Sequence, residues 1–259
     1  MPTHDGPWQD GYPCWVDLSS TDREASWAFY TEVMGWQIRD TGPDMGHYGI
    51  AMVDGRSVGA IGQAMAGQPT AWATYFASSD CDAASRRVAD AGGMVVLPAG
   101  DVGPAGRLSI CADPLGGVFG IWQGGSNPGV GLVAEPGAPV WFDHMTRDPE
   151  VARDFYAAVF GWTYTVMEDG HDYQTVDGAD PAAPICGIGH IGDVPDEVPS
   201  HWRAYFAVGD ADATVELAAA RGGQIAMQPW DTPYGRMFIV ADPQGGTFVG
   251  LGPVRDDTA

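Results

Sequence analysis

The chain has 259 residues, 45% of them hydrophobic and 18% charged, so it can bury a sizeable core and is not a disordered protein. Its 12 basic residues are all arginines and face 34 acidic ones, which gives a formal net charge of −22. We therefore exclude nucleic acid and anionic membranes as partners, because both are bound through clustered cations. No apolar run is long enough for a membrane span, and the first residues lack the features of a secretory signal, so we expect a cytoplasmic protein.

The lysine and cysteine content excludes some classes of catalytic and metal site. No lysine is present, which excludes Schiff-base catalysis and a P-loop. The four cysteines (Cys14, Cys81, Cys111 and Cys186) form no CxxC pair, so we interpret them as buried hydrophobic residues rather than metal ligands.

The first predicted elements are a short strand and an amphipathic helix. The strand covers 14–18, and the helix runs from Asp22, whose side chain caps the first turn, to Met34, where Gly35 ends it. Three strands follow, over 36–39, 48–53 and 57–62. These elements form a βαβββ unit.

A second unit of the same order follows in the chain. Its helix is capped by Asp80 or Asp82 and ends at Gly92-Gly93. A strand precedes the helix over 72–77, and three follow over 94–97, 107–112 and 118–122.

The whole arrangement recurs 126–130 residues later. Trp15, Asp17, Asp22, Phe29-Tyr30 and Gly35-Trp36 recur as Trp141, Asp143, Asp148, Phe155-Tyr156 and Gly161-Trp162. Gly106-Arg107 and Asp113-Pro114-x-Gly-Gly recur as Gly235-Arg236 and Asp242-Pro243-x-Gly-Gly. This repeat predicts two homologous domains, 1–127 and 128–259, each built from two units.

The helix segments, with the pattern Asp-x(6)-Phe-Tyr-x(4)-Gly-Trp, and the Asp-Pro-x-Gly-Gly turns resemble the vicinal oxygen chelate superfamily of glyoxalases, bleomycin-resistance proteins and extradiol dioxygenases. The resemblance covers about 12–252. It implies an α+β fold in which four βαβββ modules pair into two glyoxalase/bleomycin-resistance-like domains with open, curled mixed sheets. The chain is most similar to tandem two-domain actinomycete proteins, which include accessory proteins of aromatic polyketide pathways, mycobacterial antigens and proteins called hydroxylases.

The metal-dependent members of that superfamily hold an ion with His, Gln or Glu from the first strand of each module and from the last strand. The resemblance places those positions at Trp15, Trp141, Gly120 and Val249, and at about Ala73 and Arg203. None of these residues is an ordinary ligand for a divalent ion. We therefore expect neither a metal ion nor another cofactor.

Strand alternation predicts which side chains line the clefts instead. Trp15 shares a face with Asp17, and Trp141 with Asp143, while His47 and His171 occupy matching hairpins. The predicted ligand-binding residues are Trp15, Asp17, His47, Tyr75, Trp122, Trp141, Asp143, His171, Arg203 and Tyr205.

Several of these residues have a purely structural alternative. Trp15 and Trp141 would then fill the space of a lost metal site. Trp36 and Trp162 are expected in the core, and Arg107 and Arg236 in local salt bridges.

The aromatic clefts predict a metal-free protein that binds a planar aromatic small molecule, neutral or cationic, in resistance or biosynthesis. The alternative is a cofactor-independent enzyme acting on an aromatic polyketide, with Asp17, Asp143, His47 or His171 as acid or base. A metal-dependent glyoxalase or dioxygenase is the third and weakest hypothesis. The tandem chain is expected to be a monomer with an internal pseudo-dimer, or a homodimer.

Overall fold

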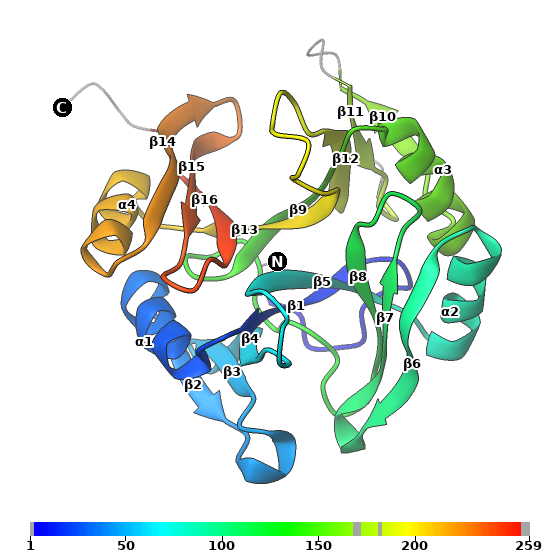
Figure 1. The fold of residues 1–259 in the computed structure, drawn as a ribbon, viewed down its shortest axis with the longest axis horizontal. Helices are drawn as coiled ribbons and strands as arrows, with labels where there is room; N and C mark the ends of the chain where they lie inside the picture. The colour runs from blue at the N-terminus through cyan, green and yellow to red at the C-terminus, as the bar shows by residue number, and fades with distance from the viewer. Residues whose placement is uncertain (1–2, 168–171, 181–182, 255–259) are drawn as a thin grey trace.

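The computed structural model describes residues 3–167, 172–180 and 183–254, and it contains the four predicted modules in order (Figure 1). The elements of the first domain are β1 (Pro13–Ser20), α1 (Arg23–Met34), β2 (Gln37–Asp40), β3 (Gly49–Val53), β4 (Arg56–Gln63), β5 (Ala71–Ala77), α2 (Cys81–Asp90), β6 (Met94–Val102), β7 (Gly106–Ala112) and β8 (Val118–Gly124). Short 3-10 turns cover Pro43–Met45 and Gly103–Ala105.

The second domain repeats this order after a linker. Its elements are β9 (Pro139–Thr146), α3 (Pro149–Phe160), β10 (Tyr164–Val166), β11 (Tyr173–Val176), β12 (Cys186–His190), β13 (His201–Ala207), α4 (Ala211–Ala220), β14 (Gln224–Thr232), β15 (Gly235–Ala241) and β16 (Thr247–Gly252). Within the described residues, no helix is both long and apolar enough to cross a membrane.

Each domain forms one eight-stranded mixed sheet. The strand orders are β2-β3-β4-β1-β5-β8-β7-β6 and β10-β11-β12-β9-β13-β16-β15-β14. The first strands of the two modules lie antiparallel at the centre, and each lies parallel to the last strand of its own module. This arrangement confirms the predicted α+β fold with two open mixed sheets.

Capping residues define the helix ends as predicted. The side chain of Asp22 accepts a hydrogen bond from the Ala25 N–H, and Gly35 ends α1 in the left-handed conformation. In α2 the cap is Asp80 rather than Asp82, because its carboxylate accepts from the Ala83 N–H. Such caps satisfy backbone donors that the first turn leaves free.

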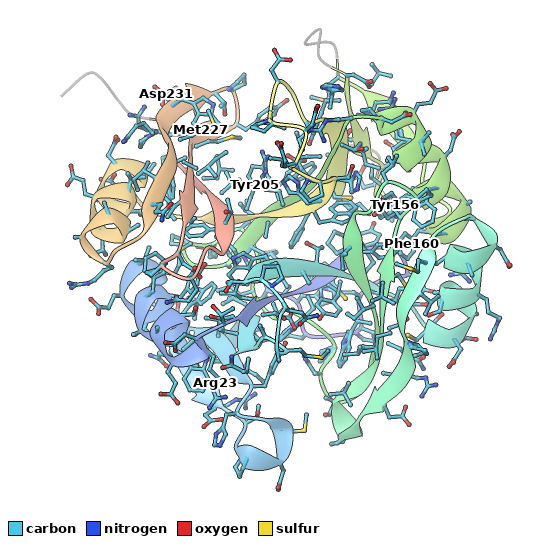
Figure 2. All side chains as sticks on the ribbon, in the orientation of Figure 1. Arg23, Tyr156, Phe160, Tyr205, Met227 and Asp231 are labelled. Carbon is cyan, nitrogen blue, oxygen red and sulfur yellow. The ribbon has the colours of Figure 1, made fainter. Side chains whose placement is uncertain are left out.

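The two domains pack through their helices into one continuous core. α1 lies beside α4, and α2 beside α3 (Figure 1). Tyr156 and Phe160 of α3, labelled in Figure 2, pack against Phe119 of the first sheet. The indoles of Trp36 and Trp162 are buried and each donates to a backbone carbonyl of the other half of the chain, so both are core residues as expected.

The two pseudo-symmetric halves of this interface differ in the side chain beside their buried aspartate. His144 of β9 contacts Asp113 of the first domain, with 2.6 Å between Nε2 and Oδ2 and both side chains fully buried. Tyr156 also donates to Asp113, at 3.0 Å. In the other half, Leu18 takes the place of His144 and lies near Asp242.

The pKa values of the two buried aspartates shift in opposite directions. Burial alone raises the pKa of Asp113, but the contact with His144 outweighs it and leaves the pKa below its ordinary value. The pKa of Asp242 is raised, because burial exceeds the effect of its backbone hydrogen bonds. One interface therefore holds a buried His–Asp contact, and the other holds a buried aspartate beside a leucine.

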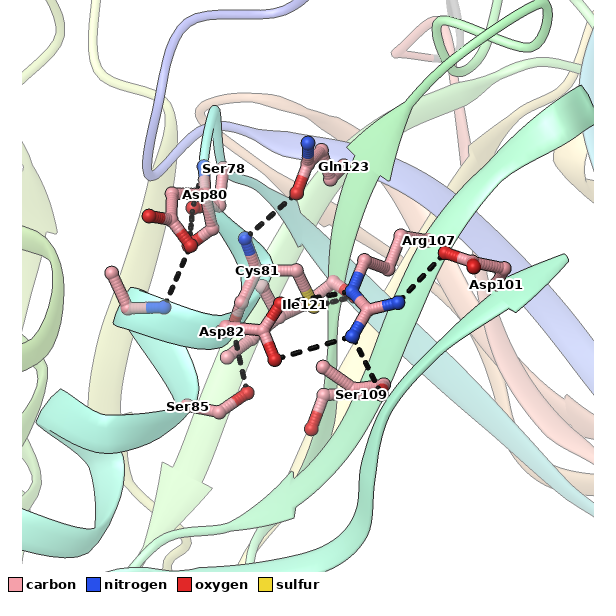
Figure 3. A network of polar contacts seen from close by, with 12 residues as sticks. Ser78, Asp80, Cys81, Asp82, Ser85, Asp101, Arg107, Ser109, Ile121 and Gln123 are labelled. Atoms are coloured by element: carbon pink, nitrogen blue, oxygen red, sulfur yellow. Dashed lines mark hydrogen bonds and ion pairs between the residues drawn. The ribbon is translucent and has the colours of Figure 1, made fainter.

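The paired Gly-Arg sites form local salt bridges. Arg107 bonds Asp82 at 2.9 Å and Asp101 at 2.7 Å, as Figure 3 shows, and Arg236 bonds Asp212 and Asp231 in the same way. The four cysteines are free and buried, as predicted.

Candidate functional site

The central strands of the first domain bring four predicted residues to one face of the sheet. Trp15 and Asp17 lie two residues apart on β1, so their side chains point the same way. Trp15 lies opposite Tyr75 in the pairing of β1 with β5. Ala77 of β5 lies opposite Trp122 of β8, which places Trp122 on the same face, two residues along from Gly120.

A cavity of about 680 Å³ lies against this face and is lined by all four side chains. This volume is within the usual range for small-molecule sites, about 300–1,000 Å³. Ile50 and Leu108 add apolar walls, and Arg39 and Arg56 also line the cavity. Another part of the wall comes from outside the sheet, from His4, Asp5, linker residues 126–129 and Gly131.

The carboxylate of Asp17 is held by aromatic side chains. The Tyr48 hydroxyl donates to its Oδ2 at 2.8 Å and itself accepts from the Trp15 indole at 2.9 Å. The single proton of the Tyr75 hydroxyl is shared between the two carboxylate oxygens, at 3.1 and 3.2 Å. Three aromatic rings thus fix one acid at the cavity wall.

Burial gives this acid an unusual proton affinity. Desolvation raises the pKa of Asp17 to about 6, although the hydrogen bonds from Tyr48 and Tyr75 lower it in part. The pKa of both tyrosines is raised well above its ordinary value, first by burial and then by the nearby Asp17 charge. Both hydroxyls therefore keep their protons at neutral pH and act as donors.

The second domain contains the same cluster in a tighter form. Tyr173 and Tyr205 each donate to a different oxygen of Asp143 at 2.6 Å, and the Trp141 indole donates to Asp143 at 2.7 Å. Asp143 is only 6% exposed. Arg203 lies opposite Asp143 in the pairing of β9 with β13.

The two clusters differ in the hydrogen bonds that their carboxylate oxygens accept. Both oxygens of Asp143 receive a short hydrogen bond of their own. Oδ1 of Asp17 receives only the long, shared bond from Tyr75, and Asp17 is half-buried at a cavity. Because a carboxylate oxygen can accept two hydrogen bonds, Oδ1 of Asp17 can accept a further one. Oδ2 of Asp143 also accepts a single bond, but that bond is 2.6 Å long and Asp143 does not line the described cavity.

The residues at the implied metal positions do not fit a metal ion. Trp15 and Trp141 use their indole nitrogens as donors to Tyr48 and Asp143. A side chain at Gly120 would start 1.9 Å from the Tyr75 ring, so this strand has no room for a ligating side chain there. Among the described residues, no group of three or more His, Cys, Asp or Glu side chains is arranged to hold an ion.

Of the two predicted histidines, only His47 lies among the described residues, and it does not line the cavity. His47 points to Asp40, with 2.8 Å between Nδ1 and Oδ2, and does not line the cavity although its neighbour Tyr48 does. We expected it in the cleft, but a left-handed backbone at His47 and the Asp40 contact turn the side chain away. His171 lies outside the described residues.

Sequence reasoning missed the second tyrosine of each cluster. Tyr48 and Tyr173 come from the third-strand region of their modules and carry no motif. A signal was present, because each directly follows the hairpin that contains the matched His47 or His171.

Comparison with known proteins identifies relatives over nearly the whole chain. The family model described as "Glyoxalase/Bleomycin resistance protein/Dioxygenase superfamily" matches residues 15–119 and 140–249. "Putative glyoxylase CFP32" of Mycobacterium tuberculosis is 40% identical over 255 residues, 95% of this chain and 96% of that protein. "Anthracycline biosynthesis protein DnrV" of Streptomyces peucetius is 36% identical over 259 residues, 92% of each chain.

Solved structures share the fold at low sequence identity. A Mn(II)-bound glyoxalase from Novosphingobium aromaticivorans superposes with a TM-score of 0.62 at 16% identity, covering 96% of this chain and 85% of that one. A 2,2',3-trihydroxybiphenyl 1,2-dioxygenase from Sphingomonas wittichii gives 0.62 at 15% identity, covering 96% and 93%.

Proposed function

Because the chain belongs to the glyoxalase/bleomycin resistance protein/dioxygenase superfamily, we propose that it binds a planar aromatic small molecule in the first-domain cavity without a metal ion. The ligand is neutral or cationic, and the protein serves a biosynthetic or resistance pathway. The observation that carries the proposal is the Asp17 carboxylate, held at the cavity wall by Tyr48 and Tyr75. Its anthracycline-biosynthesis relatives favour a polyketide-like ring system.

The cavity walls match such a ligand in shape and polarity. The indoles of Trp15 and Trp122 line the cavity but are only 5% and 6% exposed, so they offer the ligand a small apolar contact, and Ile50 and Leu108 extend that apolar wall. The free acceptor at Oδ1 of Asp17 can receive a phenol or amine proton from the ligand. One end of the ligand is thus fixed by a polar bond and its body by apolar contact.

We propose one ligand per chain, in the first domain rather than in both. The second cluster uses both oxygens of Asp143 internally through three short hydrogen bonds. It thereby stabilises the centre of its sheet, and we place it outside the binding machinery.

Leu108→Trp tests the location of the site, because it fills the cavity from its apolar wall without touching the Asp17 hydrogen bonds. Met237→Trp is the matched control, since Met237 holds the same position in β15 that Leu108 holds in β7. Metal-depleted protein is titrated calorimetrically with 2-naphthol, a neutral hydroxyanthraquinone and the planar cation proflavine.

We expect at least one of these probes to bind at a ratio near one, and Leu108→Trp to weaken it at least tenfold while Met237→Trp retains it. Binding of none of the three would refute the proposal. So would binding that requires an added divalent ion, or that is lost in Met237→Trp and kept in Leu108→Trp.

A further inference from the structure

The Asp17 cluster combines an acceptor and a donor that can both be turned toward a ligand. Oδ1 of Asp17 has a free lone pair, because its one hydrogen bond is the shared 3.2 Å bond from Tyr75. The Tyr75 hydroxyl divides its proton between two long bonds, so less hydrogen bonding is lost when it turns from the carboxylate to a ligand than with a single short bond. In the second cluster each tyrosine instead makes a single 2.6 Å bond.

Oδ2 of Asp17 is fixed independently of those two groups. Tyr48 donates to it at 2.8 Å and is itself held by the Trp15 indole at 2.9 Å. The carboxylate therefore keeps its orientation when Tyr75 turns away. A base held in place beside a movable hydroxyl donor is the arrangement that proton transfer next to a carbonyl requires.

We propose that this cluster is a proton-transfer site that enolises an aromatic-fused ketone, with Asp17 as the base and Tyr75 as the donor to the carbonyl oxygen. The inference rests on the proposed function, because the substrate must first occupy the first-domain cavity. The substrate class is a ketone whose acidic CH2 group lies between the carbonyl carbon and an aromatic ring.

The step is a tautomerisation and needs no oxidant or reductant. A proton passes from the CH2 carbon to Oδ1 of Asp17, and the electron pair of that C–H bond becomes the new C=C bond. The π pair of the carbonyl moves to its oxygen, where the Tyr75 hydroxyl stabilises the enolate by a hydrogen bond. Return of a proton from Asp17, after exchange with water, regenerates the ketone.

The acid–base properties of the two groups support this assignment. Burial raises the pKa of Asp17 to about 6, so the carboxylate is ionised at neutral pH and is a stronger base than a free aspartate. Burial and the Asp17 charge raise the pKa of Tyr75, so it keeps its proton. Tyr48 is the only other titratable group that directly hydrogen-bonds Asp17 in the described part of the chain.

Hydrogen–deuterium exchange of 2-tetralone tests the proposal. The ketone is incubated with protein in D2O at saturating concentration, and deuterium at C1 is followed by mass spectrometry. The variants are Asp17→Asn, Tyr75→Phe and the matched control Asp143→Asn, with circular dichroism to verify folding. Calorimetric titration with 2-naphthol, a stable analogue of the enol, measures occupancy of the cavity separately.

We expect exchange above the buffer rate in the wild type and in Asp143→Asn. Asp17→Asn should lose about 100-fold or more of the protein-dependent rate at saturation, and Tyr75→Phe about tenfold or more. The wild-type rate should rise with pH through about 6, as Asp17 ionises.

Failure of this inference is distinguishable from failure of the proposed function. If 2-naphthol binds and exchange equals the buffer rate, the proton-transfer site is refuted and the binding function stands. Undiminished exchange in a folded Asp17→Asn variant also refutes it. If neither naphthol nor ketone binds, and no other probe does, both proposals fall.

Discussion

The buried contact between His144 and Asp113 predicts a large and pH-dependent contribution to stability. We consider His144→Leu, because the pseudo-symmetric position already holds Leu18, fully buried beside Asp242. Leucine therefore suits this environment, and the expected loss comes from removing the histidine contact of Asp113 rather than from a cavity.

The expected loss of unfolding free energy in His144→Leu follows from the burial of both His144 and Asp113. Removing one member of a buried pair costs about 3–5 kcal/mol. Asp113 keeps hydrogen bonds from the Leu115 and Gly117 N–H groups and from Tyr156. We therefore expect the lower end, about 3 kcal/mol at pH 7, or roughly 6–12 °C in Tm for a chain of this size.

The pH dependence has a definite sign. Because the folded-state pKa of Asp113 is lowered, its stabilising effect is present above about pH 4 and is lost as the pH falls through the lowered pKa. In His144→Leu the pKa of Asp113 should instead be raised, as for Asp242. The difference in unfolding free energy between the two proteins should therefore shrink from pH 7 to pH 3.

Urea unfolding followed by tryptophan fluorescence at pH 7, 5 and 3 measures this difference. The matched control is His201→Leu, which changes a partly exposed histidine bonded only to the Pro199 carbonyl; it should cost less than about 1 kcal/mol. A His144→Leu variant as stable as the wild type at pH 7, or a loss that is constant with pH, would refute the reasoning.

Three further predictions concern the cavity and its surroundings. Gly120→Ala should destabilise by about 1–3 kcal/mol in urea, because its Cβ would meet the Tyr75 ring, whereas Gly100→Ala should be neutral; equal stabilities would contradict the packing. Affinity for a phenolic probe should fall as the pH drops below about 6, because Asp17 gains a proton; a flat titration from pH 5 to 8 would exclude Asp17 as the acceptor. Arg107→Ala should leave the binding constant unchanged, since Arg107 bonds Asp82 and Asp101 outside the cavity; lost binding would give it a ligand role.

Local patterns predicted the fold because each is decided by neighbours in sequence. Asp22 caps α1 and Gly35 ends it as expected, since capping involves residues only a few positions away. β6 was underestimated: it continues past Pro98 to Val102 instead of stopping at Leu97. It is an edge strand with bulges, where a missing N–H and an irregular register are tolerated.

Strand alternation placed Trp15, Asp17, Tyr75 and Trp122 at one cavity, because side-chain direction along a strand follows from position alone. Strand alternation alone did not identify Tyr48, whose approach to Asp17 depends on the register in which β3 pairs with β4 and β4 with β1.

The sequence also did not predict the contacts between distant segments, because these contacts depend on how the segments pack in three dimensions. His4 and the linker residues 126–129 complete the cavity wall only because the N-terminus and the linker cross its edge. His144 does face away from Asp143, as alternation requires, but its partner Asp113 belongs to the other domain. The way in which the two domains pack depends on many side chains of both domains, and no single sequence motif predicts it.

A crystal structure of the metal-depleted protein with 2-naphthol tests the central claim most directly. The account predicts the naphthalene ring in the first-domain cavity, in contact with Trp15 and Trp122, with its hydroxyl within hydrogen-bonding distance of Oδ1 of Asp17 and no ion beside it. A ligand seated in the second domain, or bound through a metal ion held by the protein, would contradict the account.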